Sequence, residues 1–155
     1  MLASCHQLLG NFQPIVDEVS SYHDLVVWQR AMQLVPLVYA LTRRLPTEER
    51  FGLANQLRRA TVSIPANIAE GQARQHRREF AHALCVARGS LAEVDTLLLT
   101  AVALRYLTDE DIKPARTLAF SIRQLLQALI RHVRSEADAL SPRRSASRRT
   151  RNAQR

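Results

Sequence analysis

The chain has 155 residues, 46% of them hydrophobic, which suits one domain with a buried core. Glycine is scarce and apolar residues recur at helical spacing, so the sequence predicts an all-α fold. The longest uncharged run in the body of the chain, from Ala31 to Thr42, is too short for the ~20 residues of a membrane span. No signal-peptide pattern opens the chain, and two isolated cysteines do not make a disulfide framework. We therefore expect a cytoplasmic protein.

The net charge of +8 is unevenly distributed. Residues 1–20 carry −2, residues 21–140 carry +4, and residues 141–155, with six arginines and no acid, carry +6. Of the 22 basic residues, Lys113 alone is lysine. Guanidinium groups bind phosphate in a bidentate manner and stack on bases, which favours a nucleic-acid partner. Codon usage in a GC-rich genome would produce the same arginine bias.

Residues 1–20 show no period and are read as an irregular arm. The first helix is predicted over about 24–45, and Ser21 and Asp24 in front of it have capping-box spacing. Apolar residues surround this helix nearly completely, so it must be buried on more than one side. A single four-helix bundle buries one face per helix, and a second protein surface is therefore implied. One apolar stripe of the helix consists of Trp28, Met32, Val35 and Tyr39.

The second helix is predicted to follow Pro46, with Thr47 as its cap, and to end near Glu70 with Gly71 as the C′ residue. It contains Pro65, although a mid-helix proline costs ~3 kcal/mol. Its core stripe is Leu53, Leu57, Ala60, Ile64 and Ile68. A polar stripe beside it is either an inter-helix hydrogen-bond network or a solvated face, and consists of Gln56, Arg59, Ser63, Asn67 and Glu70.

The third helix is predicted over about 78–106, after a basic linker at 72–77. Gly89 lies in the middle of this helix, and we expect it to permit close approach of a neighbouring helix, because glycine there costs ~1 kcal/mol against alanine. The apolar seam consists of Phe80, Leu84, Ala87, Leu91, Val94, Leu98 and Ala101.

The fourth helix is predicted to begin after Thr108, although Pro114 moves the expected start toward Ile112, and to fray between 135 and 140. Its seam is Leu118, Ile122, Leu125, Leu129 and Val133. Residues 141–155 cannot bury a core and are predicted to be a disordered tail. The fold class is therefore an antiparallel up-down-up-down four-helix bundle over 21–140, between the arm and the tail.

The chain lacks a glycine-rich phosphate loop, a Cys-x-x-Cys pair and a His-Glu-x-x-His motif. His82 and Cys85 share a helix face, but two ligands without a third do not define a metal site. No nucleophile has an activating base in the sequence pattern. We expect no enzyme activity, no metal and no cofactor.

Several motifs together resemble one known family. The most specific is Ser63-Ile64-Pro65-x-Asn67-Ile68-Ala69-Glu70-Gly71. Others are Tyr22-x-Asp24-Leu25-x-x-Trp28-Gln29, Glu79-Phe80 and Ala87-x-Gly89-Ser90-Leu91-x-Glu93. Over roughly residues 21–135, the chain resembles the four-helix bundle proteins encoded in intervening sequences of bacterial 23S ribosomal RNA genes.

The resemblance implies a small, non-enzymatic protein that assembles as a homopentamer around a central channel. The family is similar to the accessory variability determinant of diversity-generating retroelements, whose members bind a reverse transcriptase and nucleic acid through basic surface. Two departures add positive charge here: His76-Arg77-Arg78 replaces the expected Ser or Thr cap of the third helix, and the arginine-rich tail lies outside the family core.

We therefore expect an oligomeric scaffold for RNA or DNA, with a reverse transcriptase as a further partner. The alternative is an adaptor bundle that binds protein and no nucleic acid. Few aromatic residues are available for base stacking, so phosphate contact should dominate. Candidate nucleic-acid contacts are Arg74, Arg77, Arg78, Arg116, Arg123, Arg131, Arg134, Arg143, Arg144, Arg148 and Arg149. Candidate structural and oligomer residues are Trp28, Gln56, Arg59, Ser63, Pro65, Asn67, Glu70, Gly71 and Gly89.

Overall fold

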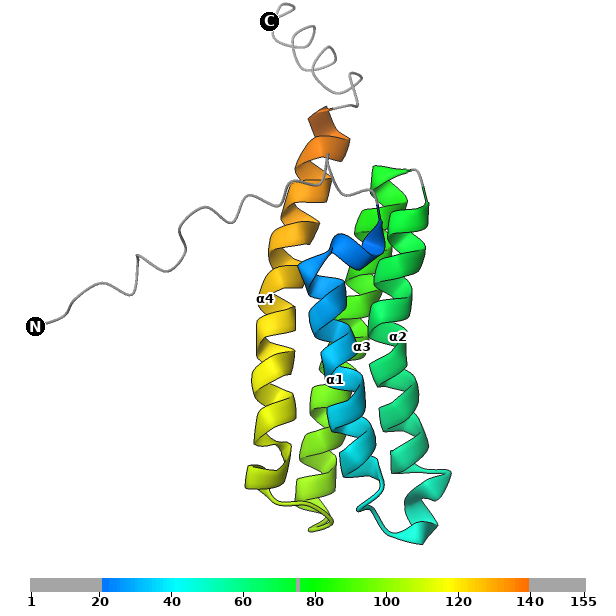
Figure 1. Cartoon of the computed structure of the whole chain (residues 1–155), viewed down its shortest axis with the longest axis vertical. Coiled ribbons are helices and arrows are strands. Elements are labelled where there is room, and N and C mark those ends of the chain that lie inside the picture. Colours follow the sequence, from blue (N-terminus) through cyan, green and yellow to red (C-terminus); the bar gives the residue numbers. More distant parts are fainter. Residues whose placement is uncertain (1–20, 75, 140–155) are drawn as a thin grey trace, which may run out of the picture.

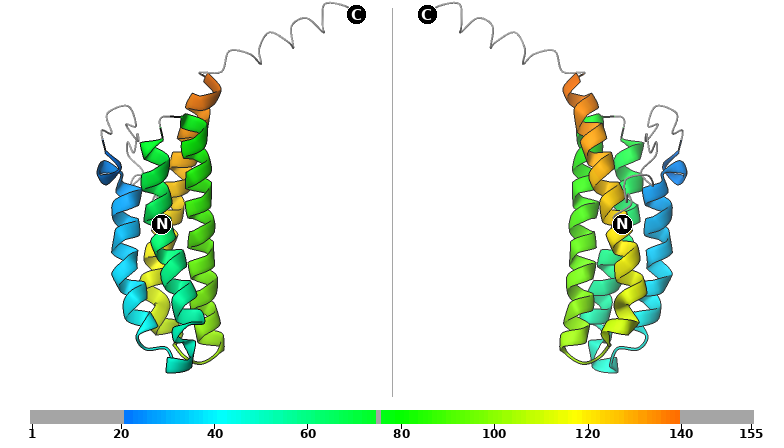
Figure 2. Two further views of the ribbon diagram at one scale, coloured as in Figure 1. Left: turned by 90° about the vertical axis from the view of Figure 1, so that its right-hand side faces the viewer. Right: turned by 90° about the vertical axis from the view of Figure 1, so that its left-hand side faces the viewer.

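The computed structural model describes residues 21–74 and 76–139, which contain helices and no strand (Figure 1). The long helices are α1 (Val26–Thr42), α2 (Leu53–Ala73), α3 (Arg77–Ala103) and α4 (Asp109–Ala139), with short 3₁₀ turns η2 (Tyr22–Asp24) and η3 (Thr47–Arg50). Successive long helices run in opposite directions, as the side views also show (Figure 2). The predicted four-helix bundle is confirmed. The predicted arm at 1–20 and tail at 141–155 lie outside the described residues.

The core forms where the predicted seams of α2 and α3 meet. Every residue of the α3 seam from Phe80 to Ala101 is buried, and so is every residue of the α2 stripe from Leu53 to Ile68. These two helices pack on each other more extensively than any other pair. Both seams were predictable because their apolar residues occupy one face and polar residues occupy the other.

The core-facing side of α1 differs from the stripe singled out in the sequence. Met32 is 43% exposed, and Trp28, Val35 and Tyr39 are only half-buried. The buried residues are instead Val27, Ala31, Leu34, Val38 and Leu41. A helix that is apolar nearly all round offers several possible core faces, so its orientation depends on the neighbouring helices and not on its own pattern.

The connection before α2 also differs from the prediction. Thr47 does not cap α2, because it opens the short turn η3, and α2 begins at Leu53. The Leu53 N–H donates to Glu49 Oε2 at 2.9 Å, so the carboxylate of Glu49 supplies the cap. The hydroxyl of Tyr106 donates to the other oxygen of Glu49 at 3.3 Å. Glu49 therefore ties the end of the α3 segment to the start of α2, a role that local sequence does not reveal.

The predictions for two of the bundle glycines, Gly71 and Gly89, do not hold within the chain. Gly71 does not end α2, which continues to Ala73, and no glycine among the described residues has positive φ. Gly71 is buried against α3, where an added Cβ would lie 2.5 Å from the Cβ of Ala83. Gly89, in contrast, is exposed, and an added Cβ there would meet nothing within 4 Å. Within the chain, it is therefore Gly71 that permits the close approach of α2 and α3.

The start of α4 is fixed by a capping box, so it lies at Asp109 and not near Ile112. The Thr108 N–H donates to Asp111 Oδ2 at 2.9 Å, and the Asp111 N–H donates to Thr108 Oγ1 at 3.3 Å. Asp111 also accepts a hydrogen bond from Arg44 at 2.7 Å. This arginine, with the two Thr108 contacts, lowers the pKa of Asp111 from 3.8 to about 2.

We expect Asp111→Asn to lower the free energy of unfolding at neutral pH and to have progressively less effect in acid. Because the pKa of Asp111 is lower in the folded state, its stabilising contribution is present above pH 3.8 and is lost as the pH falls through about 2. Urea unfolding at several pH values measures this. Asp109→Asn is the control, because it removes a neighbouring carboxylate that makes no side-chain hydrogen bond or close ion pair within residues 21–74 and 76–139. An Asp111→Asn effect that stays constant down to about pH 2 would contradict the assignment.

Candidate nucleic-acid interface

Two of the three candidate arginines around the α2–α3 turn form ion pairs within the bundle. Arg74 forms ion pairs with Glu70, one helical turn earlier, and with Glu79 at 3.5 Å. The hydrogen bond that Arg74 donates to the Glu70 carboxylate is the largest cause of the raised pKa of Arg74. Arg77 pairs with Glu136 of α4 at 2.9 Å. Much of the positive charge predicted at this turn is therefore neutralised within the bundle.

The α4 arginines bring three of the predicted contacts onto one face. Arg116, Arg123 and Arg134 are separated by seven and eleven residues, which corresponds to about two and three helical turns. Arg116 pairs with Asp95 of α3 at 2.7 Å. Arg134 donates to the Cys85 sulfur at 3.2 Å. Arg131 is exposed slightly to one side and has no ion-pair partner in the described part of the chain.

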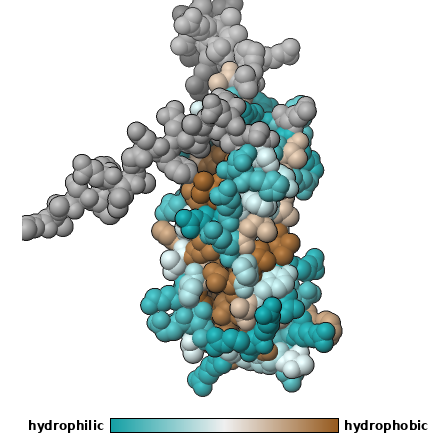
Figure 3. Space-filling model, in the orientation of Figure 1, coloured by the Kyte–Doolittle hydropathy of each residue, from teal (hydrophilic) through white to brown (hydrophobic). Residues whose placement is uncertain are grey.

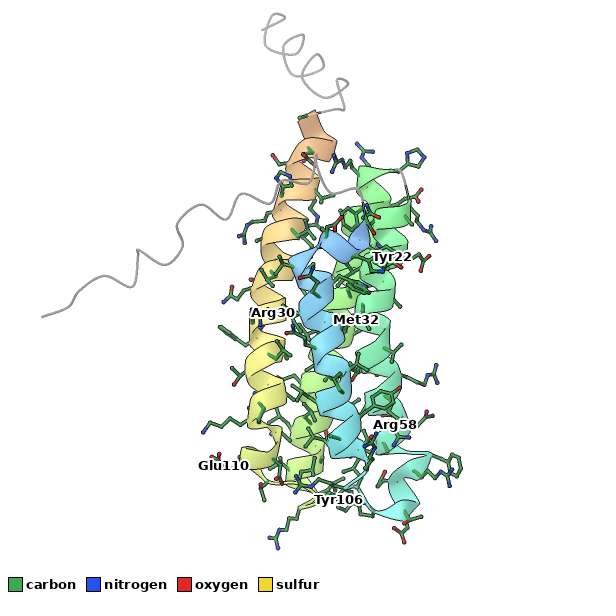
Figure 4. All side chains as sticks on the ribbon, viewed as in Figure 1. Tyr22, Arg30, Met32, Arg58, Tyr106 and Glu110 are labelled. Carbon is green, nitrogen blue, oxygen red and sulfur yellow. The ribbon has the colours of Figure 1, made fainter. Side chains whose placement is uncertain are left out.

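A groove of about 920 Å³ runs between α3 and α4 along this face, and we call it the α3–α4 groove. Its walls include two predicted contacts, Arg116 and Arg123, together with Arg88, Lys113 and Phe120, which sequence reasoning missed. A smaller pocket of about 400 Å³ adjoins it at Cys85 and is lined by Arg78, His82 and Arg134 among others. The other end of the groove lies at the start of α4 and includes Glu110, which is labelled in Figure 4.

The missed residues had a signal in the sequence. Phe120 does not belong to the apolar seam of α4, because Ala119 and Ile122 are the buried residues beside it. Because single exposed apolar residues are common on protein surfaces, this signal was weak until the fold placed Phe120 beside Arg123 in the groove. Arg88 immediately precedes Gly89 on the same exposed part of α3, but only the fold shows that this part of α3 lies beside Phe120 and Arg123.

The polar stripe of α2 divides into two kinds of environment. In its middle, Ser63 Oγ lies 2.9 Å from Ser90 Oγ of α3. The Asn67 side-chain amide donates to the Ser63 carbonyl at 2.7 Å and to Ser63 Oγ at 2.9 Å. At its ends, Gln56, Arg59 and Glu70 are exposed. Within one protomer, the middle of the stripe therefore forms an inter-helix hydrogen-bond network, and both ends of the stripe are a solvated face.

A second surface of interest lies on the opposite side of the bundle and is called the α1–α2 face. It consists of the outer stripe of α1 (Trp28, Met32, Val35 and Tyr39) with Arg58 and Val62 of α2. Met32 and Val62 are each 43% exposed, and the guanidinium of Arg58 lies 5.5 Å from the Tyr39 ring centroid. In Figure 4, Met32 lies on the side of α1 that faces α2, and Arg58 lies on α2. Figure 3 shows hydrophobic patches on this side of the molecule.

Two residues of the predicted structural set remain. The Trp28 ring packs edge-on against Tyr22 at 5.2 Å and against His23 at 4.9 Å, measured between centroids. These contacts join η2 to α1 at the end of the α1–α2 face. Pro65 is buried inside α2, which continues through it for two more turns. The proline is thus accommodated within a helix that the tertiary packing holds.

The described residues hold no group of three or more His, Cys, Asp or Glu side chains arranged to bind a metal ion. His82, Cys85 and Asp138 all line the smaller pocket, but in the described part of the chain they do not form a group that could hold a metal ion. None of the helices between residues 21 and 139 is both long enough and apolar enough to span a membrane.

These features define a class: an all-α four-helix bundle with apolar side chains exposed on the α1–α2 face and a groove between α3 and α4 that is lined by both basic and acidic residues. The family described as 23S rRNA-intervening sequence protein matches residues 23–128. The chain belongs to this family. No curated protein matches the sequence.

Among solved structures, the chain is similar to a protein of unknown function from the S23 ribosomal protein family of Bacteroides thetaiotaomicron. The two share 26% sequence identity with a TM-score of 0.63, over 68% of this chain and 96% of the other. The similarity therefore covers nearly all of that protein, and the arginine-rich end of this chain is outside the family match.

Proposed function

We propose that this protein is a non-enzymatic, homo-oligomeric cytoplasmic scaffold that binds RNA or DNA, mainly through phosphate contacts. The observation that carries the proposal is the row of cations on the α3–α4 side. Arg88 and Arg123 line the groove without an acidic partner among the described residues, and Arg134 and Arg78 continue the row beyond Cys85. Guanidinium groups held on a rigid helix face suit a phosphate backbone.

The proposed oligomer is a homopentamer, as the family resemblance implies. The α1–α2 face supports self-association, because α1 leaves apolar side chains exposed after its own core face is buried. Exposed apolar side chains that gather on one face are candidates for an interaction site. Assembly would also place several α3–α4 grooves in one particle, so that individually weak contacts gain from effective concentration.

We further propose a reverse transcriptase as a protein partner, from the resemblance to the accessory variability determinant. Co-purification with such an enzyme would support this role. The arginines of residues 141–155, including Arg143, Arg144, Arg148 and Arg149, are proposed to add sequence-independent attraction for nucleic acid.

The proposal predicts a steep loss of RNA and DNA affinity with rising salt. Each neutralised phosphate contributes about 0.9 to the log–log salt slope on duplex DNA and about 0.7 on single strands. A chain that ends at Leu140 should bind with a flatter slope. Replacing Arg88, Arg123 and Arg134 by Ala should weaken binding further and equally for all sequences.

The matched control replaces Arg30, Arg43 and Arg50 by Ala. These three arginines are also exposed and without ion-pair partners in the described part of the chain, and the change in net charge is the same. If the shortened chain binds nothing, or if the two triple variants lose affinity equally, the bundle is not the proposed nucleic-acid scaffold.

A protein-binding adaptor is the second candidate, and the ion pairs favour it. Arg74, Arg77 and Arg116 each have a carboxylate partner, so three of the predicted phosphate contacts are already engaged within the chain. Partner binding that persists unchanged in high salt, with no affinity for RNA or DNA, would support the adaptor.

A further inference from the structure

Phe120 has an environment that the core of the bundle does not explain. Its side chain is 53% exposed on the outer part of α4, and it lines the α3–α4 groove. The guanidinium of Arg123 lies 5.2 Å from its ring centroid. An aromatic ring with an adjacent guanidinium in an open groove is typical of sites where the bases of single-stranded nucleic acids stack on a protein.

Gly89 contributes open space to the same groove. A glycine in an exposed helix interior costs ~1 kcal/mol against alanine. No neighbour within the chain requires its small size, since an added Cβ would meet nothing within 4 Å. The missing side chain instead leaves the α3 wall of the groove open to a ligand.

The charges along the groove are not uniform. Arg116 and Lys113 are paired with Asp95 and Glu110, and Asp109 adds a further acid at that end. Toward Cys85, Arg88 and Arg123 have no such partner in the described part of the chain. The half of the groove that contains Phe120 and Gly89 therefore holds the cations that are available to phosphate.

We infer that the α3–α4 groove binds single-stranded RNA or DNA, with one base stacked on Phe120 and the adjoining phosphates held by Arg88 and Arg123. This inference rests on the proposed function and names its ligand class and site. A single strand presents free base faces, whereas a duplex keeps its bases stacked on one another and offers Phe120 only its backbone. An acidic peptide could satisfy the two arginines but would have no planar group for the ring.

The test compares an oligo(dT) of about 12 nucleotides, which is within the usual range of single-strand site sizes, with a duplex of the same length. Binding of both labelled probes to the full chain is measured by fluorescence anisotropy. We expect Phe120→Ala to weaken oligo(dT) binding about tenfold, within the range measured for single stacked bases. The affinity for the duplex should change less than twofold in Phe120→Ala. The separate variant Phe120→Tyr, which keeps an aromatic ring, should bind oligo(dT) as wild type does.

Two further variants test whether oligo(dT) binding depends on the groove itself. Gly89→Leu fills the groove without altering charge, and the open space at Gly89 means that folding should be retained. It should weaken oligo(dT) binding as Phe120→Ala does. Phe51→Ala is the matched control, because Phe51 is 82% exposed with the Arg50 guanidinium 5.5 Å from its ring, yet lies outside the groove.

The outcomes distinguish this inference from the proposed function. If wild type binds neither probe at low salt, both fail. If wild type binds both probes and neither Phe120→Ala nor Gly89→Leu changes the preference for the single strand, the scaffold stands and the groove inference is overturned. It is also overturned if a poly-glutamate peptide competes as well as oligo(dT), or if Phe120→Ala changes the particle size in light scattering and leaves affinity unchanged.

Discussion

Gly71→Ala should destabilise the bundle by about 1–3 kcal/mol, the usual cost of inserting a methyl group into a well-packed core. The new Cβ would lie 2.5 Å from the Cβ of Ala83 and 3.0 Å from Cδ2 of Phe80. Neither contact can be relieved by rotating a long flexible side chain. The strain would fall on the α2–α3 pair, the most extensive helix pair of the core. Urea unfolding followed by circular dichroism measures the change.

Gly89→Ala is the matched control and should have the opposite sign. Gly89 is also inside a long helix, but an added Cβ there meets open space, so the substitution should stabilise by about 1 kcal/mol through helix propensity alone. A neutral or stabilising Gly71→Ala would show that α3 can move away from α2 without cost, and would contradict the packing role given to Gly71.

Leu34→Ala should cost about 2–5 kcal/mol, because it removes a side chain with no exposed surface from the core of α1. Met32→Ala on the same helix should change monomer stability by less than about 0.5 kcal/mol, as expected for a surface position. Met32→Glu should instead reduce the particle size in light scattering, since it places a charge on the α1–α2 face. Unfolding at low protein concentration separates the two effects.

Two results would contradict this description of α1. If Met32→Ala destabilises as much as Leu34→Ala, the outer stripe is part of the core. If wild type is a monomer at micromolar concentration, the apolar face serves something other than self-association, and the proposed homopentamer is wrong.

The two proposed surfaces are compatible because they lie on opposite sides of the bundle. In an up-down-up-down arrangement α1 and α2 are neighbours, and so are α3 and α4. Figure 1 shows α1 between α2 and α4 on the near side, with α3 behind. Copies could therefore associate through the α1–α2 face while the α3–α4 groove of each copy stays open to nucleic acid.

The sequence by itself determined the fold class, the number of helices and the seams of α2 and α3. In α3, apolar residues repeat without interruption from Phe80 to Ala101, and only one helix face can satisfy such a pattern. The capping boxes at Ser21 and Thr108 were also readable, because such a box depends on side chains three residues apart. The Ser21 box, however, caps the turn η2 and not the first long helix, because α1 begins at Val26 without a side-chain cap. The motif around Pro65 was specific enough to indicate the family.

Only the tertiary structure decided the features that depend on distant residues. It decided which apolar stripe of α1 faces the core, because several stripes were equally apolar. It separated Gly71, pressed against Ala83, from Gly89, which is open, because helix propensity treats both glycines alike. It also decided which arginines are available, since Arg116 meets its carboxylate 21 residues away while Arg123 lies beside Phe120. Partners of this kind are set by the packing of helices, and one-dimensional spacing carries no information about them.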